Sequence, residues 1–568
     1  MKQVVVNLLQ KALEELGVKL KKEEIEKVIE TPPSSDMGDY AFPCFFLASK
    51  LKSEPQQIAL ELRAKIKKFP MTDFDDIQTS GAYVNFILDR KNMARKIVWE
   101  AITQKKNFGK SKIGAGRRTM VEFPSPNTNK PLHLGHLRNM SIGESISKLL
   151  EFNGVKVIRA NLYNDRGTHI CKSMLAYQKW GRDKTPASKK IKSDHFVGDF
   201  YVMFNKNLKK NKKLEDDAQA MLMKWEEGDK RVLLLWKLMT NWAINGFNET
   251  YKKFGIKHDV TFFESKLYEK GRTLVEEGLK NKLFVKSKKG DVKINLEGEG
   301  LGEKILLRSD GTSLYIVQDL ALAKIKFEKY KLNESYYVVG SEHDYHFKTL
   351  FSILDKLGFK NKGLKHLSYG MVNLPEGKMK GREGTVVDAD DLIEKVQELV
   401  KKELISRAKL SKRELEKRSL VISLAAIKYF LLKIDIKKDM LFNPKASINF
   451  EGDTGPYILY SYARASSILR KAGVQGKFNI GEMEPKELEL VKKLSQFPDV
   501  VLRAYNSLNP SLIANYSFQL AKLFNEFYHA CPVIGSENES FRLALVEAFR
   551  RVLGNSLNLL GIETLEEM

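Results

Sequence analysis

Cysteine and long apolar runs are both scarce in this chain. Its 568 residues include three cysteines, Cys44, Cys171 and Cys531, which are too few and too widely spaced for a disulfide framework or a zinc cluster. No apolar run approaches the roughly 18 residues that a membrane-spanning helix requires. These absences predict a cytoplasmic protein, kept in a reducing environment and without a membrane segment.

Acidic residues are outnumbered over the whole chain, although not at its start. The first thirty residues contain six glutamates and no arginine, which argues against a secretory signal or a mitochondrial transit peptide. Over the chain, 96 Lys+Arg against 71 Asp+Glu leave a formal net charge of +25. This excess favours polyanionic partners such as a nucleic-acid backbone. A lysine-rich proteome would give the same balance, so charge alone does not identify the partner.

Length and composition predict a globular protein of several domains. A hydrophobic content of 43%, with 10% aromatic residues, excludes wholesale disorder. A chain of this length exceeds the ~250–300 residues at which a single core stops growing, so two to four domains are expected.

Residues 1–112 are predicted to form an N-terminal α+β domain. Its first thirty residues have the leucine spacing of two short amphipathic helices. Residues 41–51 and 58–66 also show helical periodicity, and 81–88 alternate as a strand does. A glycine-rich linker at 107–116 ends this domain.

After the linker, strand-like and helix-like segments alternate, which predicts a parallel sheet with crossover helices and an α/β fold class. This domain is assigned to 113–395, with an insertion at about 183–300 that contains a hairpin turn near Gly290. Residues 396–440 are predicted to form a helical connector and 441–568 a helical domain. The expected strands are 119–123, 155–162, 313–317, 336–340 and 367–372, with a helix starting near His136.

The sequence His133-Leu134-Gly135-His136 is the strongest local signal for chemistry. Two histidines three residues apart at a helix start place their rings on one side, and a helix N-terminus favours phosphates. Gly135 would leave room for a flat base against the backbone. Taken alone, an H-x-x-H sequence is more often a capping or surface pair than a nucleotide site.

The flanking sequence resembles the HIGH signature of class I aminoacyl-tRNA synthetases, and the extended string at 122–139 resembles the arginyl-tRNA synthetase family in particular. Segments along essentially the whole chain agree with that family in order and spacing. They are 38–41 for its additional N-terminal domain, which touches the tRNA elbow, 310–319 for its amino-acid pocket, 377–387 for its KMSK loop, and 453–469 with 518–532 for its helical anticodon-binding domain.

The resemblance implies a Rossmann-type parallel-sheet catalytic domain between an N-terminal α+β domain and a C-terminal all-α helix bundle. It implies ATP-dependent activation of L-arginine to arginyl-adenylate and transfer to the 3′ end of tRNA(Arg), by a monomer. Mg²⁺ is implied by ATP, and no residue is assigned as a metal ligand. The residues that the resemblance assigns to ATP are His133, Gly135, His136, Lys378 and Met379.

Arginine recognition calls for a carboxylate, because the guanidinium is planar and presents a fork of donors. The resemblance assigns this role to Asp319, with Tyr315 beside it. It places Glu122, Ser125, Asn127, His133 and His136 around the rest of the substrate, and His343 where many relatives carry glutamine. Taken alone, Asp319 also reads as a helix N-cap before an apolar run.

The lysine loop departs from K-M-S-K, because Lys380 takes the place of serine and Gly381 that of the final lysine. Charge that develops on the departing pyrophosphate still needs a cation. Lys380 and Arg382 flank the gap, and Lys130 precedes His133 by three residues. Family members with a degenerate loop resemble this chain in keeping a lysine there. We therefore predict that Lys130 replaces the missing lysine.

In the C-terminal domain, Tyr457, Tyr460 and Arg464 share one helix face. Aromatic rings and arginine on an exposed face can stack on unpaired tRNA bases, at ~1–3 kcal/mol per base. The alternative is that the two tyrosines belong to the core. Core positions are also predicted for Phe524, Phe527, Tyr528 and Cys531.

Three other functions compete with arginine charging. A lysyl or glutamyl synthetase of the same class would share the motifs, but the pairing of Tyr315 with Asp319 favours arginine. A non-catalytic tRNA-binding relative is disfavoured by the intact His133, His136 and Asp319. A small-molecule adenylyltransferase with an H-x-G-H helix would lack a helical C-terminal domain of this size.

Overall fold

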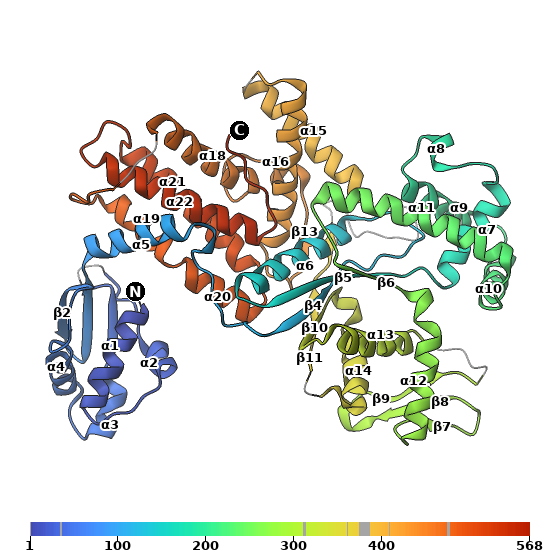
Figure 1. Cartoon of the computed structure of the whole chain (residues 1–568), viewed down its shortest axis with the longest axis horizontal. Helices are drawn as coiled ribbons and strands as arrows, with labels where there is room; N and C mark the ends of the chain where they lie inside the picture. Colours follow the sequence, from blue (N-terminus) through green and yellow to red (C-terminus); the bar gives the residue numbers. More distant parts are fainter. Residues whose placement is uncertain are drawn as a thin grey trace. The chain divides into compact units, whose positions relative to one another are not determined.

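The computed structural model describes residues 2–34, 37–309, 314–360, 362–373, 387–407, 409–473 and 477–568 (Figure 1). The chain divides into two compact units. One consists of residues 1–108, 465–497 and 522–552, and the other of residues 109–464, 498–521 and 553–568. Both units therefore include parts of the C-terminal helices.

The N-terminal part of the first unit contains helices α1 to α4 and a three-stranded antiparallel sheet in the order β1–β3–β2. The predicted helices in the first thirty residues and at 58–66 are confirmed, and so is the strand at 81–88. The elements are α1 (Lys2–Glu15), α2 (Lys22–Val28), β1 (Tyr40–Pro43), α3 (Ala48–Leu51), α4 (Pro55–Ile66), β2 (Phe74–Ser80) and β3 (Tyr83–Leu88).

The helix predicted over 41–51 is wrong at its start. Tyr40–Pro43 pairs antiparallel with β3 instead, and α helix is confined to Ala48–Leu51. Pro43 has no N–H to donate and so cannot continue a helix from this point. Strand β2 was not predicted, because its sequence FDDIQTS shows only a weak apolar alternation.

The helical part of the first unit contains α5 (Arg90–Gln104), α19 (Pro485–Ser495) and portions of the last two helices. The Phe524 and Phe549 rings stack 3.8 Å apart between centroids. Arg542 Nε lies 2.6 Å from Glu487 Oε1, and both side chains are buried. Removing one partner of such a pair leaves an uncompensated buried charge, so this ion pair fixes the packing of α19 on α22.

The second unit is built on a parallel five-stranded sheet in the order β11–β10–β4–β5–β6. Strands β5 and β6 follow on one side of β4, and β10 and β11, which come later in the sequence, lie on its other side. Ligands of open α/β sheets bind where the strand order reverses in this way. The elements are β4 (Arg118–Glu122), α6 (Leu134–Phe152), β5 (Lys156–Tyr163), β6 (Val260–Phe263), α13 (Tyr315–Tyr330), β10 (Glu334–Gly340), α14 (Asp344–Leu354) and β11 (Gly363–Tyr369).

Two groups of elements are inserted in the chain between strands of this sheet (Figure 1). Helices lie between β5 and β6, and a helix with a small antiparallel sheet lies between β6 and α13. The predicted insertion at about 183–300 therefore contains β6, a strand of the main sheet. The predicted hairpin turn at Gly290 is confirmed, with a positive φ of 95°. The elements are α7 (Thr168–Trp180), α8 (Pro186–Lys189), α9 (Ser193–Leu208), α10 (Lys213–Glu226), α11 (Lys230–Phe254), α12 (Tyr268–Lys280), β7 (Val285–Lys286), β8 (Val292–Leu296) and β9 (Gly302–Leu307).

The strand predicted at 313–317 is wrong where the structure describes it, because helix α13 begins at Tyr315. Tyr315-Ile316-Val317 has strand propensity when read alone. The buried positions Val317, Leu320, Ala323 and Phe327 recur at helical spacing, and this core face overrides the local preference.

The remaining elements are helical as predicted, apart from a short parallel pair, β12 (Val372–Asn373) with β13 (Met440–Leu441). The last residues return to the second unit, where Leu559 O accepts from Ser145 Oγ and Gly561 O accepts from Lys428 Nζ, both at 2.7 Å. In the described part of the chain, no helix is long and apolar enough to cross a membrane. The helices are α15 (Ala389–Arg407), α16 (Lys412–Leu432), α17 (Pro444–Ser447), α18 (Gly455–Ala472), α20 (Phe497–Ser507), α21 (Ser511–Ala530) and α22 (Glu539–Leu559).

Candidate active site

The two histidines of the H-x-G-H sequence close the N-terminus of α6. His133 Nδ1 accepts from Gly135 N at 3.1 Å, and His136 Nδ1 accepts from His133 N at 3.0 Å. The capping alternative is therefore correct as a description of structure, and it orients both rings. With each Nδ1 acting as acceptor, the proton of each neutral ring lies on Nε2, where it can be donated to a phosphate.

Burial keeps both rings uncharged. It lowers the pKa of His133 to about 3, with a further contribution from the charge of Lys130. Burial, His133 and Lys130 hold the pKa of His136 well below its ordinary value. Lys130 is itself half-buried, and burial lowers the pKa of its ammonium. A cation and two neutral donors thus lie together at a helix N-terminus, an arrangement suited to phosphate.

Gly135 is required for this arrangement of rings. A Cβ at this position would lie 2.9 Å from His133 Cε1, so any other residue would displace the His133 ring. The sequence predicted a different reason for the glycine, the approach of a base to the backbone. The crowding by His133 is sufficient to explain it.

A cavity of about 480 Å³ opens at the carboxyl ends of β4, β5, β6 and β10. Six side chains that the sequence assigned to arginine line it, and His133 and His136 are not among its lining residues. The six are Glu122, Ser125, Asn127, Tyr315, Asp319 and His343.

Asp319 lies in the second turn of α13, so its interpretation as a helix N-cap is wrong. Its Oδ2 lies 2.7 Å from His346 Nε2, and its side chain is 32% exposed, which leaves the carboxylate accessible from the cavity. Tyr315 lies one turn earlier on the same helix face. Burial and the Glu264 carboxyl raise the pKa of the Tyr315 hydroxyl, which places these groups in one neighbourhood.

Sequence reasoning missed Glu264, which lines the cavity together with the carboxyl groups of Asp319 and Glu122. It follows β6 directly, is 5% exposed, and burial raises its pKa to about 8. With its amide oriented to satisfy both neighbours, Gln318 donates to Glu264 Oε1 at 2.7 Å and accepts from Arg166 Nη1 at 3.1 Å. A carboxylate at the end of a parallel strand was the available signal. It was overlooked because β6 lies within the segment taken as an insertion.

Glu122 lies on the cavity but is already paired. Its Oε2 is 2.7 Å from the ammonium of Lys326, a completely buried residue of α13. Burial lowers the pKa of Lys326, but Glu122 outweighs burial and the net pKa is raised. The charge of Glu122 is therefore balanced within the protein, which weakens it as a partner for a substrate ammonium.

Ser125 and Asn127 lie on the loop after β4, held by Asn161 of β5 and by Asn164, which directly follows that strand. Ser125 N donates to Asn161 Oδ1 at 3.2 Å, and Ser125 O accepts from Asn164 Nδ2 at 2.9 Å. Residues 127 and 164 form a parallel bridge. These contacts fix the backbone of the loop, with Asn127 exposed at the cavity.

The lysine-loop residues Lys378, Met379, Lys380 and Arg382 lie outside the described residues. The chain on both sides is described, and it is fixed to α6. Arg138, one turn after His133, is fully buried. Its guanidinium donates to four backbone carbonyls, those of Gly370 at 2.7 Å, Met371 at 3.2 Å, Ile436 at 3.2 Å and Lys438 at 2.8 Å.

The three residues assigned to tRNA all lie on α18, but their surroundings differ. Tyr457 is half-buried and packs against Phe518, with ring centroids 5.8 Å apart. Tyr460 is 37% exposed, and the Arg464 guanidinium lies 4.8 Å from its ring centroid. Core positions are confirmed for Phe524, Phe527 and Cys531, whereas Tyr528 is 38% exposed and that prediction was wrong.

The parallel sheet, the switch point and the paired histidines define the catalytic domain of a class I aminoacyl-tRNA synthetase. The family described as "tRNA synthetases class I (R), catalytic domain" matches residues 97–443. The "Arginyl tRNA synthetase N terminal domain" matches 3–88, and the "DALR anticodon binding domain" matches 458–568. The chain belongs to the arginyl-tRNA synthetase family.

Individual relatives agree over nearly the full chain. The arginine–tRNA ligase of Treponema denticola is 46% identical, covering 95% of this chain and 94% of the relative. That of Borrelia duttonii is 40% identical, covering 99% and 98%. Among solved structures, the arginyl-tRNA synthetase of Thermus thermophilus matches with a TM-score of 0.82 and 26% identity, covering 100% of both chains.

We predict that His133 and His136 are neutral Nε2–H tautomers at pH 6. Because the folded pKa of His133, about 3, lies below the ordinary 6.5, only the unfolded chain takes up this proton between those values. Stability contributed by His133 is therefore present above pH 6.5 and lost as pH falls toward 3. Long-range ¹H–¹⁵N spectra of histidine-labelled protein test the tautomers.

Spectra of His133→Asn and His136→Asn proteins identify the two rings. His195 provides a charged reference, because neighbouring carboxylates outweigh its burial and raise its pKa to about 9. An imidazolium pattern from His133 or His136 at pH 6 would contradict the prediction.

Proposed function

We propose that this chain activates L-arginine with ATP and transfers it to the 3′ end of tRNA(Arg). The observation that carries the proposal is a cavity containing two carboxyl groups, Asp319 and Glu264, on the sheet that also leads to the phosphate-type site of His133 and His136. Membership of the arginyl-tRNA synthetase family supports it.

The guanidinium is assigned to Asp319, Glu264 and Tyr315. One carboxylate can meet two of its N–H groups, and a second is needed to satisfy the remaining donors. Glu264 is held for this purpose by Gln318 and is buried, so it loses its proton when the cation arrives. A lysine ammonium, which is compact and has three donors, would leave part of this arrangement unpaired.

The α-amino and carboxylate groups are assigned to Ser125, Asn127 and His343, with Glu122 contributing to the lesser extent that its pairing with Lys326 allows. Asn127 offers both donor and acceptor. The substrate carboxylate is thereby directed away from the guanidinium end of the cavity and toward α6. His133 and His136 act at that end on ATP, together with Gly135.

In the first step, an oxygen of the arginine carboxylate attacks the α-phosphorus of ATP, and the bond to the β,γ-pyrophosphate breaks. In the second, a terminal ribose hydroxyl of tRNA attacks the carbonyl carbon, losing its proton, and AMP leaves. The Nε2–H groups of His133 and His136 stabilise charge on the phosphates, so positioning and electrostatics dominate. Mg²⁺ enters as a complex with ATP. From the sequence alone, Lys378 and Met379 are assigned to ATP, and Lys380 and Arg382 are candidate catalytic residues beside the gap in the lysine loop.

For tRNA, the exposed pair Tyr460–Arg464 is the better candidate for stacking on an anticodon base, and Tyr457 is better explained as packing. The Arg464 guanidinium already lies on the Tyr460 ring, which presents a planar surface to a base.

The first prediction concerns the substrate. The purified protein should esterify labelled arginine onto total tRNA in the presence of ATP, and should not charge lysine or glutamate at comparable rates, because two carboxyl groups match a guanidinium. Charging of lysine or glutamate in preference to arginine, or no charging at all, would reject the proposal.

The second prediction separates the two carboxyl groups. Asp319→Ala should raise the KM for arginine by at least ~100-fold with little change for ATP, since a bidentate charge-assisted contact is lost. Glu264→Gln should also raise the KM for arginine, and should remove the dependence of that KM on pH. With a pKa of about 8, Glu264 is mostly protonated at pH 7 and must release a proton to bind the cation, so the wild-type KM rises as pH falls below 8.

Asp355 is an exposed carboxylate outside the cavity, so Asp355→Asn is the matched control. It should change neither the KM for arginine nor its pH profile. An arginine KM for Glu264→Gln that still follows the wild-type pH profile would remove Glu264 from the site.

The third prediction tests Lys130 as the cation for the departing pyrophosphate. Lys130→Ala should lower kcat for aminoacylation by roughly 10²-fold or more, with arginine and tRNA affinities little altered. Adding Gly381→Lys should restore part of the loss. Lys156→Ala, an exposed lysine at the start of β5, serves as the control. Single-turnover adenylate formation by Lys130→Ala within about threefold of wild type would exclude this role.

A further inference from the structure

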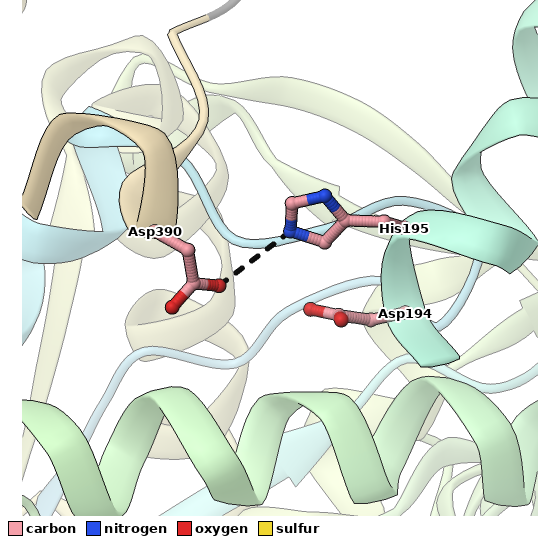
Figure 2. A group of neighbouring side chains, drawn as sticks. All are labelled: Asp194, His195 and Asp390. Carbon is pink, nitrogen blue, oxygen red and sulfur yellow. Dashed lines mark ion pairs between the residues drawn. The ribbon is translucent and has the colours of Figure 1, made fainter. Parts of the chain in front are cut away.

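A cluster of charged side chains joins three segments of the second unit outside the arginine cavity (Figure 2). Asp194 and His195 lie in the first turn of α9, and Asp390 lies in the first turn of α15. Lys192 Nζ lies 3.0 Å from Asp194 Oδ2 and 2.7 Å from Asp390 Oδ2. Thr250 of α11 donates to Asp390 Oδ2 at 2.9 Å.

The spacing of Asp194, His195 and Asp390 could suit a metal ion, since their ligand atoms lie within 4.8 Å of one another. The ammonium of Lys192 already contacts both carboxylates and so supplies the cation. The cluster is therefore an ion-pair network, and its role must be sought in the segments that it joins.

His195 is the second cation of the network. Its Nε2 lies 3.3 Å from Asp388 Oδ2 and 3.5 Å from Asp390 Oδ2. Burial lowers the pKa of His195, but the carboxylates outweigh burial and raise it to about 9, so the imidazole is charged at neutral pH. The charged groups that face it are Lys192, Asp194 and Asp199 from the start of α9, and Asp388 and Asp390 from the start of α15.

The segment held by His195 is paired directly with the phosphate-type site. Leu134 N donates to Val387 O, and Ala389 N donates to Leu132 O, both at 3.0 Å, so residues 387–389 flank His133 on its backbone side. Asp388 Oδ1 also caps α15 by accepting from the N–H groups of residues 390 and 391. Any shift of Asp388 is thereby transmitted to the backbone that sets the His133 ring.

Helix α9 also contacts the site from a second direction. A Cβ at Gly198 would lie 2.6 Å from Pro131 Cδ and 3.5 Å from Lys130 Cα, so this helix lies directly against the Lys130 backbone. His195 and Gly198 are three residues apart and share one face of α9. The same face therefore contacts Lys130 through Gly198 and the neighbours of His133 through Asp388.

We propose that His195 is a positioning residue for ATP, which holds residues 387–390 and α9 against the 130–134 segment and so fixes His133 and Lys130 relative to the phosphates. The proposal rests on the proposed function. A residue that acts in this way should affect the ATP reaction selectively, because the arginine cavity is built from other elements. Misplacing a catalytic group by about 1 Å can cost on the order of 10²-fold in rate.

The test compares His195→Gln, which removes the charge, with His195→Lys, which retains it. At saturating arginine, His195→Gln should lower kcat/KM for ATP in tRNA charging by about tenfold or more, while the arginine KM changes less than about threefold. His195→Lys should recover most of the loss. Lys253→Gln is the matched control, because Lys253 pairs with Glu394 at 3.4 Å between α11 and α15 at the exposed surface.

The pH profile gives a second readout. For the wild type, kcat/KM for ATP should fall above about 9, where His195 loses its proton, and below about 6, where Asp388 gains one. Burial raises the pKa of Asp388 and the His195 charge opposes that rise, so His195→Gln should move the acid limb to higher pH. His195→Lys should move the alkaline limb upward instead.

An effect of His195→Gln on ATP no larger than that of Lys253→Gln would overturn the proposal. So would an equal loss for ATP and arginine accompanied by a lower melting temperature, or a failure of His195→Lys to restore activity in a protein that melts like wild type. If His195→Gln does not fold, His195→Lys and the wild-type pH limbs still decide the question. A failure of the proposed function would appear in the wild-type protein itself, as an absence of arginine charging.

Discussion

The guanidinium of Arg138 is the contact on which the catalytic unit depends. Its position on α6, just after the two histidines, allows it to donate to four carbonyls from two distant chain segments. Two of the four, Met371 O and Ile436 O, also accept from the backbone N–H groups of Met440 and Gly370, both at 2.9 Å, so the guanidinium reinforces this backbone pairing and adds donors for Gly370 O and Lys438 O. A buried carbonyl without a donor costs roughly 1–3 kcal/mol. One arginine therefore holds together the helix of the phosphate-type site, the chain after β11 and the chain before β13. A lysine could not replace it, because three donors on a flexible stem cannot serve four fixed acceptors.

The two ends of the active site are electrically distinct. At α6 the histidines are neutral and the nearby lysine provides positive charge, which suits phosphates. At the far end of the cavity, Asp319 provides negative charge, and Glu264 adds a second one when it releases its proton to a bound guanidinium. Lys326 balances Glu122 between them, so the middle of the site is close to neutral. This order along the sheet edge orients a substrate whose carboxylate must reach the α-phosphate while its side chain points away.

The sequence predicted the parts of this site that depend on local signals. The H-x-G-H segment predicts the start of a helix, and in the structure both rings lie at the N-terminus of α6. The apolar strands β4, β5 and β10 were predictable for the same reason. What could not be predicted depends on contacts between distant residues. The pairing of Glu122 with Lys326 and the place of β6 at the sheet edge require the folded sheet, and without β6 the role of Glu264 has no context. Helix α13 was mistaken for a strand because three residues with strand propensity precede its helical core face.

The route of the C-terminal chain has a consequence for synthesis. Leu559 and Gly561 supply carbonyls to Ser145 of α6 and Lys428 of α16, so the unit that contains the catalytic sheet is completed by residues 553–568. The contact of Ser145 with Leu559 joins residues that are 414 positions apart in the sequence. The sheet β1–β3 pairs segments that are close in sequence and can form early in translation, whereas α6 gains its hydrogen bond to Leu559 only after residues 553–568 have been synthesised. Contacts this distant in sequence require a long loop to close before they form, so the unit with the catalytic sheet is expected to be completed later than the sheet β1–β3.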